Sequence, residues 1–306
     1  MTIASIDIGT NTVLLLIAEV TKELEIKTLL DEYRIPRIGK GLIPNSQISE
    51  NKINDLIIVL GEYKKLVESY NCKKILITAT NAMRIAVNKD QIAAKIRALF
   101  GWDVNIVSGK EEARLSYLGA VSGFSENGTV VVIDIGGGST ELIFGKQTEI
   151  EFIKSFPIGV VSGTETYLKN DPPTLKQLEN FREHLQIILG EISTLEYNPN
   201  IAIALAGTPT TLACMDLNLD KYDEKLIEAY ELGYNRISGL KDHIMKITYA
   251  EIKNTYKSVV KGREDLILAG ALILLNIMRL LKLANIKVST RGIRYGVIIN
   301  EINQYR

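Results

Sequence analysis

Two short stretches combine an acidic residue, glycines and hydroxyl side chains in the same order. The first, IDIGTNT, covers residues 6–12, and the second, IDIGGGST, covers residues 133–140. In both, an apolar run typical of a buried strand ends at an aspartate and continues into residues that suit a tight turn. Glycines in such a turn let backbone N–H groups approach a ligand, and Ser or Thr hydroxyls add donors. Both stretches therefore suit phosphate binding.

The two stretches share the spacing D-I-G-x-x-[ST]. Strand-like residues follow each copy, so each turn is expected to join two strands, unlike the strand-to-helix turn of a P-loop, and no Lys follows the glycines. A single copy is more often an ordinary hairpin turn than a ligand site. Two copies predict a duplicated unit with two phosphate-binding hairpins. The matching residues are Asp7, Gly9 and Thr12 in the first copy and Asp134, Gly136 and Ser139 in the second.

The order of the predicted elements agrees with a duplication. Three strands are expected between residues 3 and 32, followed by a helix with Ser49 as its N-cap and by alternating strands and helices up to residue 121. A similar succession follows the second hairpin, apart from one segment before residue 249 whose structure the pattern does not predict. We expect domains 1–123 and 124–306, with the last helix able to pack back on the first domain. A ligand cleft is expected between the two α/β domains.

Composition narrows the classes of protein. Of 306 residues, 46% are hydrophobic, and Lys plus Arg and Asp plus Glu both number 36, so no global charge favours nucleic acid or an anionic membrane. Cys72 and Cys214 lie far apart, which argues against a disulfide framework or a zinc site. The most apolar run, residues 266–278, is shorter than the roughly 20 residues that span a bilayer. With no basic region of a signal peptide, a cytoplasmic location is expected.

Seven segments carry a resemblance to a known family through their order and spacing. They are similar to motifs of the exopolyphosphatase and guanosine pentaphosphate phosphohydrolase (Ppx/GppA) family, within the actin, sugar kinase and heat-shock ATPase superfamily. The resemblance covers nearly the whole chain and implies a short form with duplicated actin-like (ribonuclease H-like) α/β domains, each with a mixed five-stranded sheet. The segments are IDIGTNT (6–12), PRIGKGL (36–42), ATNAMRIAVN (79–88), SGKEEARLSYLG (108–119), IDIGGGSTEL (133–142), LAGTPTTLA (205–213) and STRGIRYGVI (289–298).

Hydrolysis of a phosphoanhydride requires an aligned water, positive charge on the phosphate oxygens and a base for the water. Glu111 and Glu112 lie about 100° apart on a helix, so only one can face a given site. The resemblance assigns the catalytic base to Glu112. A solvated acidic pair at a helix N-terminus is the alternative reading of the residues alone.

Further residues are expected to hold metal and phosphate. Asp134 and Glu141 are expected to hold Mg²⁺ or another divalent cation such as Mn²⁺, because magnesium prefers a few carboxylates with waters and phosphate oxygens. Arg84 is expected to clamp a phosphate in bidentate fashion. His184 and His243 have no neighbouring His or Cys, which argues against a histidine nucleophile. The other expected phosphate contacts are Asp7, Gly9, Thr10, Asn11, Thr12, Gly136, Gly137, Gly138, Ser139, Thr140, Gly207 and Thr208.

The expected activity is that of an exopolyphosphatase, which releases terminal orthophosphate from inorganic polyphosphate. Hydrolysis of pppGpp to ppGpp is the alternative within the family, and a sugar or acetate kinase or a non-catalytic phosphate sensor is the alternative outside it. Leu14 departs from the family pattern, which commonly has an arginine there. Since the sequence stops at Arg306, we expect a short form that lacks the C-terminal helical domains of the long forms. The resemblance includes homodimers among the expected states.

Overall fold

The chain forms two compact units in the computed structural model, which describes residues 1–124 and 128–305. Unit 1 comprises Met1–Gly119 and Ile293–Arg306, and unit 2 comprises Ala120–Gly292. Unit 1 thus ends four residues before residue 123. It also includes the last helix, which lies in the expected range 124–306 but was expected to be able to pack back on the first domain. The physical reason is burial: Tyr295, Ile298 and Ile302 pack into an apolar cluster with strands of unit 1.

Unit 1 is built on a mixed five-stranded sheet in the order β3-β2-β1-β4-β5. The first three strands form an antiparallel meander, and β4 and β5 run parallel to β1. Residues 3–8 of β1 are all buried, as expected for the central strand. The strands are β1 (Thr2–Ile8), β2 (Val13–Val20), β3 (Ile26–Arg34), β4 (Lys74–Ala79) and β5 (Val104–Ile106).

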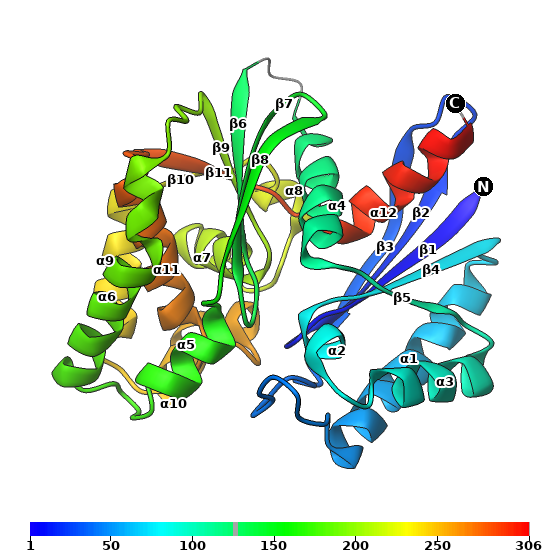
Figure 1. Cartoon of the computed structure of the whole chain (residues 1–306), viewed down its shortest axis with the longest axis horizontal. Helices are drawn as coiled ribbons and strands as arrows, with labels where there is room; N and C mark the ends of the chain where they lie inside the picture. Colours follow the sequence, from blue (N-terminus) through cyan, green and yellow to red (C-terminus); the bar gives the residue numbers. More distant parts are fainter. Residues whose placement is uncertain (125–127, 306) are drawn as a thin grey trace. The chain divides into compact units, whose positions relative to one another are not determined.

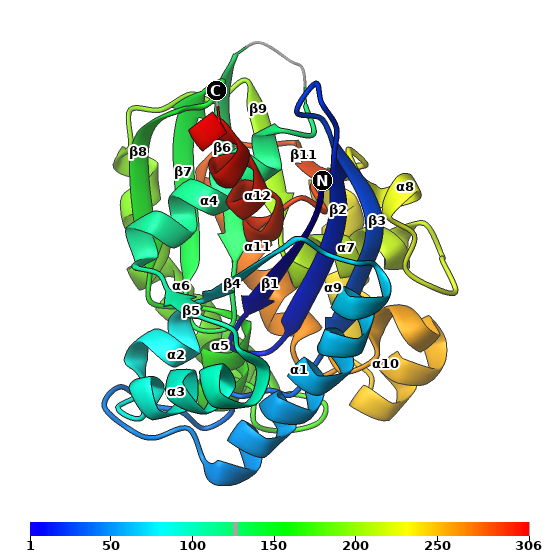
Figure 2. The same ribbon diagram turned by 90° about the vertical axis from the view of Figure 1, so that its right-hand side faces the viewer.

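Helices cover both faces of this sheet (Figures 1 and 2). One apolar cluster joins the strands to α1 (Glu50–Ser69), α2 (Asn81–Ile85) and α3 (Lys89–Phe100). On the other face, α12 (Ile293–Ile302) packs on β1 and β2, and α4 (Gly109–Val121) packs on α12. A short helix, η3 (Asn303–Tyr305), follows α12.

Unit 2 repeats the plan with a larger sheet in the order β10-β11-β9-β6-β7-β8. This sheet has six strands in the described chain instead of the expected five. The added strand is β10, three residues that pair antiparallel with β11 and lie in the segment whose structure the sequence pattern did not predict. The strands are β6 (Thr129–Ile135), β7 (Thr140–Lys146), β8 (Glu149–Phe156), β9 (Ile201–Leu205), β10 (Glu231–Gly233) and β11 (Asn285–Val288).

The core of unit 2 lies between one face of its sheet and a layer of helices (Figure 1). The most apolar helix, α11, is the centre of this layer, and eleven of its fourteen residues are buried. None of the helices in the described part of the chain combines the length and the apolar character that a bilayer span requires. The helices are α5 (Val160–Tyr167), α6 (Leu175–Leu189), η1 (Gly190–Thr194), α7 (Gly207–Asp216), α8 (Glu224–Ile227), α9 (Tyr234–Ile244), α10 (Tyr249–Tyr256), η2 (Lys257–Val260) and α11 (Ile267–Leu280).

Candidate active site

The two D-I-G-x-x-[ST] stretches form β-hairpins of the same geometry, one in each unit. In each, four residues connect paired strands, β1 to β2 and β6 to β7. The N–H of Gly9 donates to the carbonyl oxygen of Thr12 at 3.0 Å, and that of Gly136 donates to Ser139 at 2.9 Å. A Cβ on Gly9 would lie 2.9 Å from that Thr12 oxygen, so a side chain there would strain the turn. The sequence repeat is therefore also a repeat of structure.

A neighbouring segment binds the carbonyl groups at the tip of each hairpin. In unit 1 the PRIGKGL segment does so, since Arg37 N–H donates to Asn11 O at 3.0 Å and Gly39 N–H donates to Thr10 O at 2.9 Å. In unit 2 the first turn of α5 does so, since Val161 N–H donates to Gly137 O at 2.8 Å.

The backbone N–H groups at the tips of the two hairpins are available to a ligand. Within residues 1–124 and 128–305, those of Thr10, Asn11, Gly137 and Gly138 have no acceptor. Backbone N–H groups fixed in one direction by their own carbonyls form an anion-binding concavity. Each hairpin can therefore donate to phosphate oxygens.

A third turn lies at the same edge of the sheet of unit 2 as the second hairpin. Strands β6 and β9 are parallel with Asp134 opposite Leu205, so both strands end at this edge. Helix α7 begins at Gly207 directly after Ala206, whose backbone (φ 75°, ψ −167°) lies in a region that is favourable only for glycine. Arg263 packs on Gly207, where a Cβ would meet its Nη1 at 2.2 Å. The turn thus combines helix N–H groups with an arginine.

Unit 1 brings Arg84 and Glu112 into direct contact. Arg84 lies on α2, which follows β4, and its Nη1 donates to Glu112 Oε2 at 2.7 Å and to Val107 O at 3.1 Å. Both side chains are largely buried, with 27% and 19% exposed. In this structure Arg84 holds the carboxylate of Glu112, and its expected bidentate contact with phosphate stays a prediction.

Glu111 faces away from this pair. Its carboxylate forms a bidentate ion pair with Arg114 at 2.8 and 2.9 Å, which lowers its pKa. Ser108 fixes the start of α4, because its hydroxyl accepts from the Glu111 N–H and its carbonyl accepts from the Glu112 N–H. The helix therefore directs the two glutamates to different neighbours, as their angular separation predicts.

Burial raises the pKa of both carboxylates near the first hairpin. For Glu112 the cause is loss of hydration, which the hydrogen bond and charge of Arg84 partly offset. For Asp7, loss of hydration and the negative charge of Glu112 raise the pKa to about 7, against the smaller opposite effect of Arg294. Leu14 lies directly opposite Asp7 on β2, so the residue that departs from the family pattern contributes apolar surroundings to this carboxylate. The negative charge of Glu112 therefore acts on Asp7.

Asp134 and Glu141 are directly opposite each other in the β6–β7 pair, so both side chains lie on one face of the hairpin. Glu141 is 6% exposed, and its Oε1 accepts from the hydroxyl of Ser155 at 2.7 Å. No group of three or more His, Cys, Asp or Glu residues in the described chain is arranged to hold a metal. Two adjacent carboxylates still fit a magnesium ion that takes its other ligands from water and phosphate.

Two expected phosphate contacts use their side chains inside unit 2. The hydroxyl of Thr140 donates to Ile158 O at 2.6 Å, and the residue is fully buried. Thr208 is 5% exposed and packs on α11, where a Cβ on Gly270 would lie 2.2 Å from its hydroxyl oxygen. Sequence reasoning also missed Gly159, which must lack a side chain because a Cβ would lie 2.5 Å from the backbone of Gly137. Only close packing, which no local motif encodes, reveals these roles.

Comparisons with known proteins agree with the geometry. Residues 16–305 match the model of the Ppx/GppA phosphatase family. The chain is 31% identical over 321 residues to exopolyphosphatase 2 of Mycobacterium tuberculosis, with 97% of this chain and 98% of that protein covered. It is 32% identical over 295 residues to a bifunctional 3-dehydroquinate synthase/phosphatase of Fusobacterium nucleatum, which covers 90% of this chain but only 43% of that protein.

A solved structure shows the same fold. The crystal structure of the Aquifex aeolicus member of the Ppx/GppA family superposes with a TM-score of 0.85 and 33% identity, covering 100% of this chain and 99% of that one. The family model and this superposition both extend over nearly the whole chain. The chain therefore belongs to the Ppx/GppA phosphatase family, with that family's two actin-like α/β units, and is a hydrolase.

Proposed function

We propose that the chain is an exopolyphosphatase that releases terminal orthophosphate from inorganic polyphosphate. The observation that carries the proposal is the buried pair of Glu112 and Arg84, because a desolvated carboxylate held in one orientation is suited to take a proton from water. The two hairpins with available N–H groups supply sites for phosphate oxygens.

In this mechanism the water oxygen bonds to the terminal phosphorus and the bridging P–O bond breaks, which releases orthophosphate and the shortened polyphosphate. Glu112 accepts the proton of the attacking water on its carboxylate. Arg84 keeps the carboxylate of Glu112 fixed and ionised until it accepts the proton. Thr10, Asn11, Gly137 and Gly138 bind phosphate oxygens through their N–H groups. Asp7 lies beside Glu112 and orients the water or the terminal phosphate. Catalysis then depends on position and charge, without a covalent intermediate on the protein.

A divalent cation suits the family and the donor set, and we propose that it is Mg²⁺ held by Asp134 and Glu141 with the help of water. A bound cation would neutralise charge on the phosphate oxygens. Without positive charge, the two carboxylates beside the second hairpin would repel a polyanion. Asp134→Asn and Glu141→Gln should therefore weaken the dependence of phosphate release on magnesium concentration.

Polyphosphate is favoured over pppGpp by the surroundings of the first hairpin. Leu14 lies opposite Asp7, so a leucine adjoins the carboxylate at the position where the family commonly has an arginine. A leucine offers neither a charge for an extra phosphate nor a hydrogen bond for a base.

The direct test is phosphate release from polyphosphate, pppGpp and ATP, measured side by side with Mg²⁺. The proposal expects the highest kcat/KM for polyphosphate and loss of activity in excess EDTA. Preference for pppGpp would move the assignment to guanosine pentaphosphate hydrolysis. Transfer to a sugar or acetate without free phosphate would identify a kinase, and binding without turnover would identify a sensor.

A further inference from the structure

The face of the unit 1 sheet beneath α12 contains buried oxygen atoms without protein partners. Among the described residues, Ser5 Oγ, Asp7 Oδ1 and Asp31 Oδ2 are buried and have no hydrogen-bond partner. Ser5 and Asp7 lie two residues apart on β1 and therefore point to the same face. Asp31 on β3 lies in the same row as Ser5, with Leu16 of β2 between them. Such atoms are costly to bury unless a charge or water compensates them.

Arg294 provides a buried positive charge at this place. It enters from α12 with only 7% of its side chain exposed, and its Nη1 lies 2.5 Å from Asp31 Oδ1 and 3.2 Å from Leu15 O. Leu15 pairs with Ile6 on β1, the neighbour of Asp7, so the guanidinium contacts β2, the strand between β3 with Asp31 and β1 with Asp7. The positive charge of Arg294 also acts on Asp7, whose pKa it lowers against the effect of burial.

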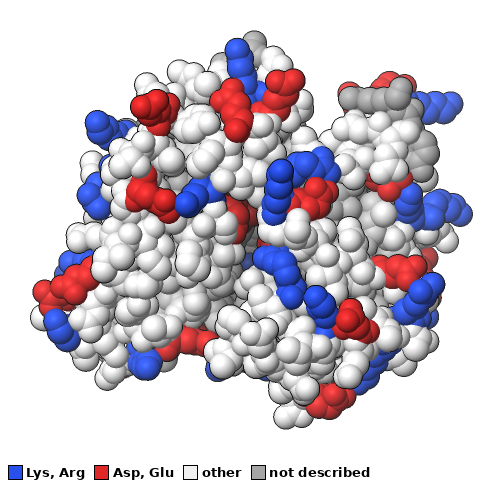
Figure 3. Space-filling view, viewed as in Figure 1, with Lys and Arg blue, Asp and Glu red and all other residues white. Residues whose placement is uncertain are grey.

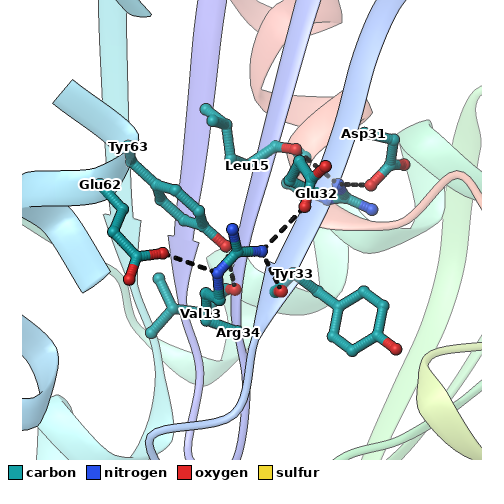
Figure 4. A network of polar contacts seen from close by, with 9 residues as sticks. Val13, Leu15, Asp31, Glu32, Tyr33, Arg34, Glu62 and Tyr63 are labelled. Carbon is teal, nitrogen blue, oxygen red and sulfur yellow. Dashed lines mark hydrogen bonds and ion pairs between the residues drawn. The ribbon is translucent and has the colours of Figure 1, made fainter. Parts of the chain in front are cut away.

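A second arginine–carboxylate cluster, on β3, is more exposed to water than the Arg294–Asp31 pair. Arg34 contacts Glu32 and Glu62, each at 2.8 Å, and lies near the ring of Tyr63 (Figure 4). The side chain of Arg34 is 38% exposed, so water screens this cluster, which faces α1 and not α12. The Arg294–Asp31 pair is much less exposed, and an electrostatic effect on Asp7 is correspondingly stronger.

Helix α12 is also fixed to the helix that carries the base. Gly296 packs so closely on α4 that a Cβ would lie 1.8 Å from Leu115 O. Arg114, on the α4 turn after Glu112, donates to Asn300 Oδ1 at 2.6 Å. Helix α12 therefore contacts both β1, which carries Asp7, and α4, which carries Glu112.

We propose that Arg294 is a positioning residue of the hydrolytic centre: held by Asp31 and Leu15, its guanidinium fixes the ionised Asp7 side chain beside Glu112. The proposal rests on the proposed roles of Asp7 and Glu112. Asp7 and Glu112 repel each other when both are ionised, and Arg84 already contacts Glu112. Arg294 supplies the second positive charge that the pair needs.

The test compares Arg294→Met, Arg294→Lys and the matched control Lys74→Met. Lys74 also joins α12 to the sheet through an ion pair with Glu301, but Glu301 lies two helical turns from Arg294. At a temperature where all variants are folded, Arg294→Met should lower kcat by about ten-fold or more with a smaller change in KM. Arg294→Lys should recover most of this loss because it keeps the charge. Lys74→Met should stay within about three-fold of the wild-type kcat.

Double variants separate an effect on Asp7 from a purely structural role. In an Asp7→Asn background, Arg294→Met should reduce kcat little further, because the partner charge is already absent. Since Arg294→Met leaves Asp31 buried without its cation, Arg294→Met combined with Asp31→Asn provides a variant that is easier to fold. If the losses in kcat from Arg294→Met and Asp7→Asn are additive, the proposal is overturned. It is also overturned if Arg294→Lys does not recover kcat.

A stability cycle makes the inference testable without any substrate. Unfolding by urea at pH 8 is measured for wild type, Arg294→Met, Asp7→Asn and the double variant. Arg294→Met raises the unfolding equilibrium constant by some factor. That factor should be at least about five-fold larger when residue 7 is aspartate than when it is asparagine. Coupling without polyphosphate hydrolysis would support the Arg294–Asp7 interaction and refute the proposed activity. Absence of coupling with hydrolysis intact would refute the role of Arg294 alone.

Discussion

At the scale of single residues, Glu111 and Glu112 are neighbours with opposite electrostatic environments. Burial raises the pKa of Glu112, whereas the bidentate pair with Arg114 lowers that of Glu111. Glu112→Gln should keep substrate binding but lower kcat by about 10²-fold or more, the usual effect of removing a general base. Glu111→Gln is the matched control and should change kcat much less. Phosphate release under saturating polyphosphate measures both, and near-normal rates for both would place the base elsewhere.

Ionisation of Asp7 is expected to lower the free energy of unfolding as the pH rises through neutral. Its folded pKa of about 7 lies above the ordinary value of 3.8. Its contribution to stability is therefore complete below about pH 4 and is lost as the pH rises through about 7. Asp7→Asn should raise Tm relative to wild type more at pH 8 than at pH 4.5, by about 2 °C for each pKa unit at this chain length.

Asp103 provides the control for this prediction. Its side chain is 78% exposed, so Asp103→Asn should change the Tm little compared with Asp7→Asn. The activity of Asp7→Asn should fall although its stability rises. An equal Tm difference at the two pH values would show that the fold does not bear a cost for ionising Asp7.

At the scale of elements, the contact between α4 and α12 requires a glycine, Gly296, on α12. A Cβ on Gly296 would lie 1.8 Å from the carbonyl oxygen of Leu115, which is backbone and cannot rotate away. Gly296→Ala should therefore force the helices apart, destabilise the protein by about 1–3 kcal/mol and lower kcat through the displacement of Glu112. Gly61→Ala on α1 is the control, because open space surrounds Gly61 and alanine favours a helix. Urea unfolding and phosphate release give the two readouts, and a stable, fully active Gly296→Ala would contradict the packing.

The turn before α7 stores backbone strain that a glycine would relieve. Ala206 has φ 75° and ψ −167°, a conformation that costs residues with a Cβ about 1–3 kcal/mol. Ala206→Gly should therefore stabilise the protein against urea, although the greater freedom of glycine in the unfolded chain reduces the gain. Ala204→Gly, two residues earlier in the buried strand β9, should destabilise it. The same sign for both variants would argue against strain at Ala206.

At the scale of the whole molecule, the repeated motif predicted more of the structure than periodicity did. The paired hairpins follow from the D-I-G-x-x-[ST] repeat. Strand β10 was missed because three residues are too few to show an alternating pattern. The sequence pattern did not predict the role of Arg294, because its partner Asp31 is 263 residues away in sequence and only the packing of α12 brings them together. Motifs thus predict local turns, whereas long-range ion pairs require the fold.

The balance of charge over the chain leads to the last prediction, which concerns salt and substrate length. Lys plus Arg equals Asp plus Glu at 36 each, and side chains of both signs mix on the face shown in Figure 3. A long polyanion gains affinity from an extended basic path, and such binding weakens steeply with salt. Because the phosphate sites described here are local turns, kcat/KM for polymers of a few tens of phosphates should change little with salt and should exceed that for pppGpp.

Leu14→Arg tests this prediction on the same chain. An arginine opposite Asp7 adds a positive charge beside the first hairpin, so it should raise kcat/KM for pppGpp relative to polyphosphate and make both more sensitive to salt. Leu29→Arg is the control, since Leu29 is 37% exposed on the edge strand β3 and gives the chain the same net charge. The measurement is the ratio of the two kcat/KM values between about 50 and 200 mM salt. A wild-type ratio that already favours pppGpp, or equal effects of the two arginines, would show that Leu14 does not set the preference.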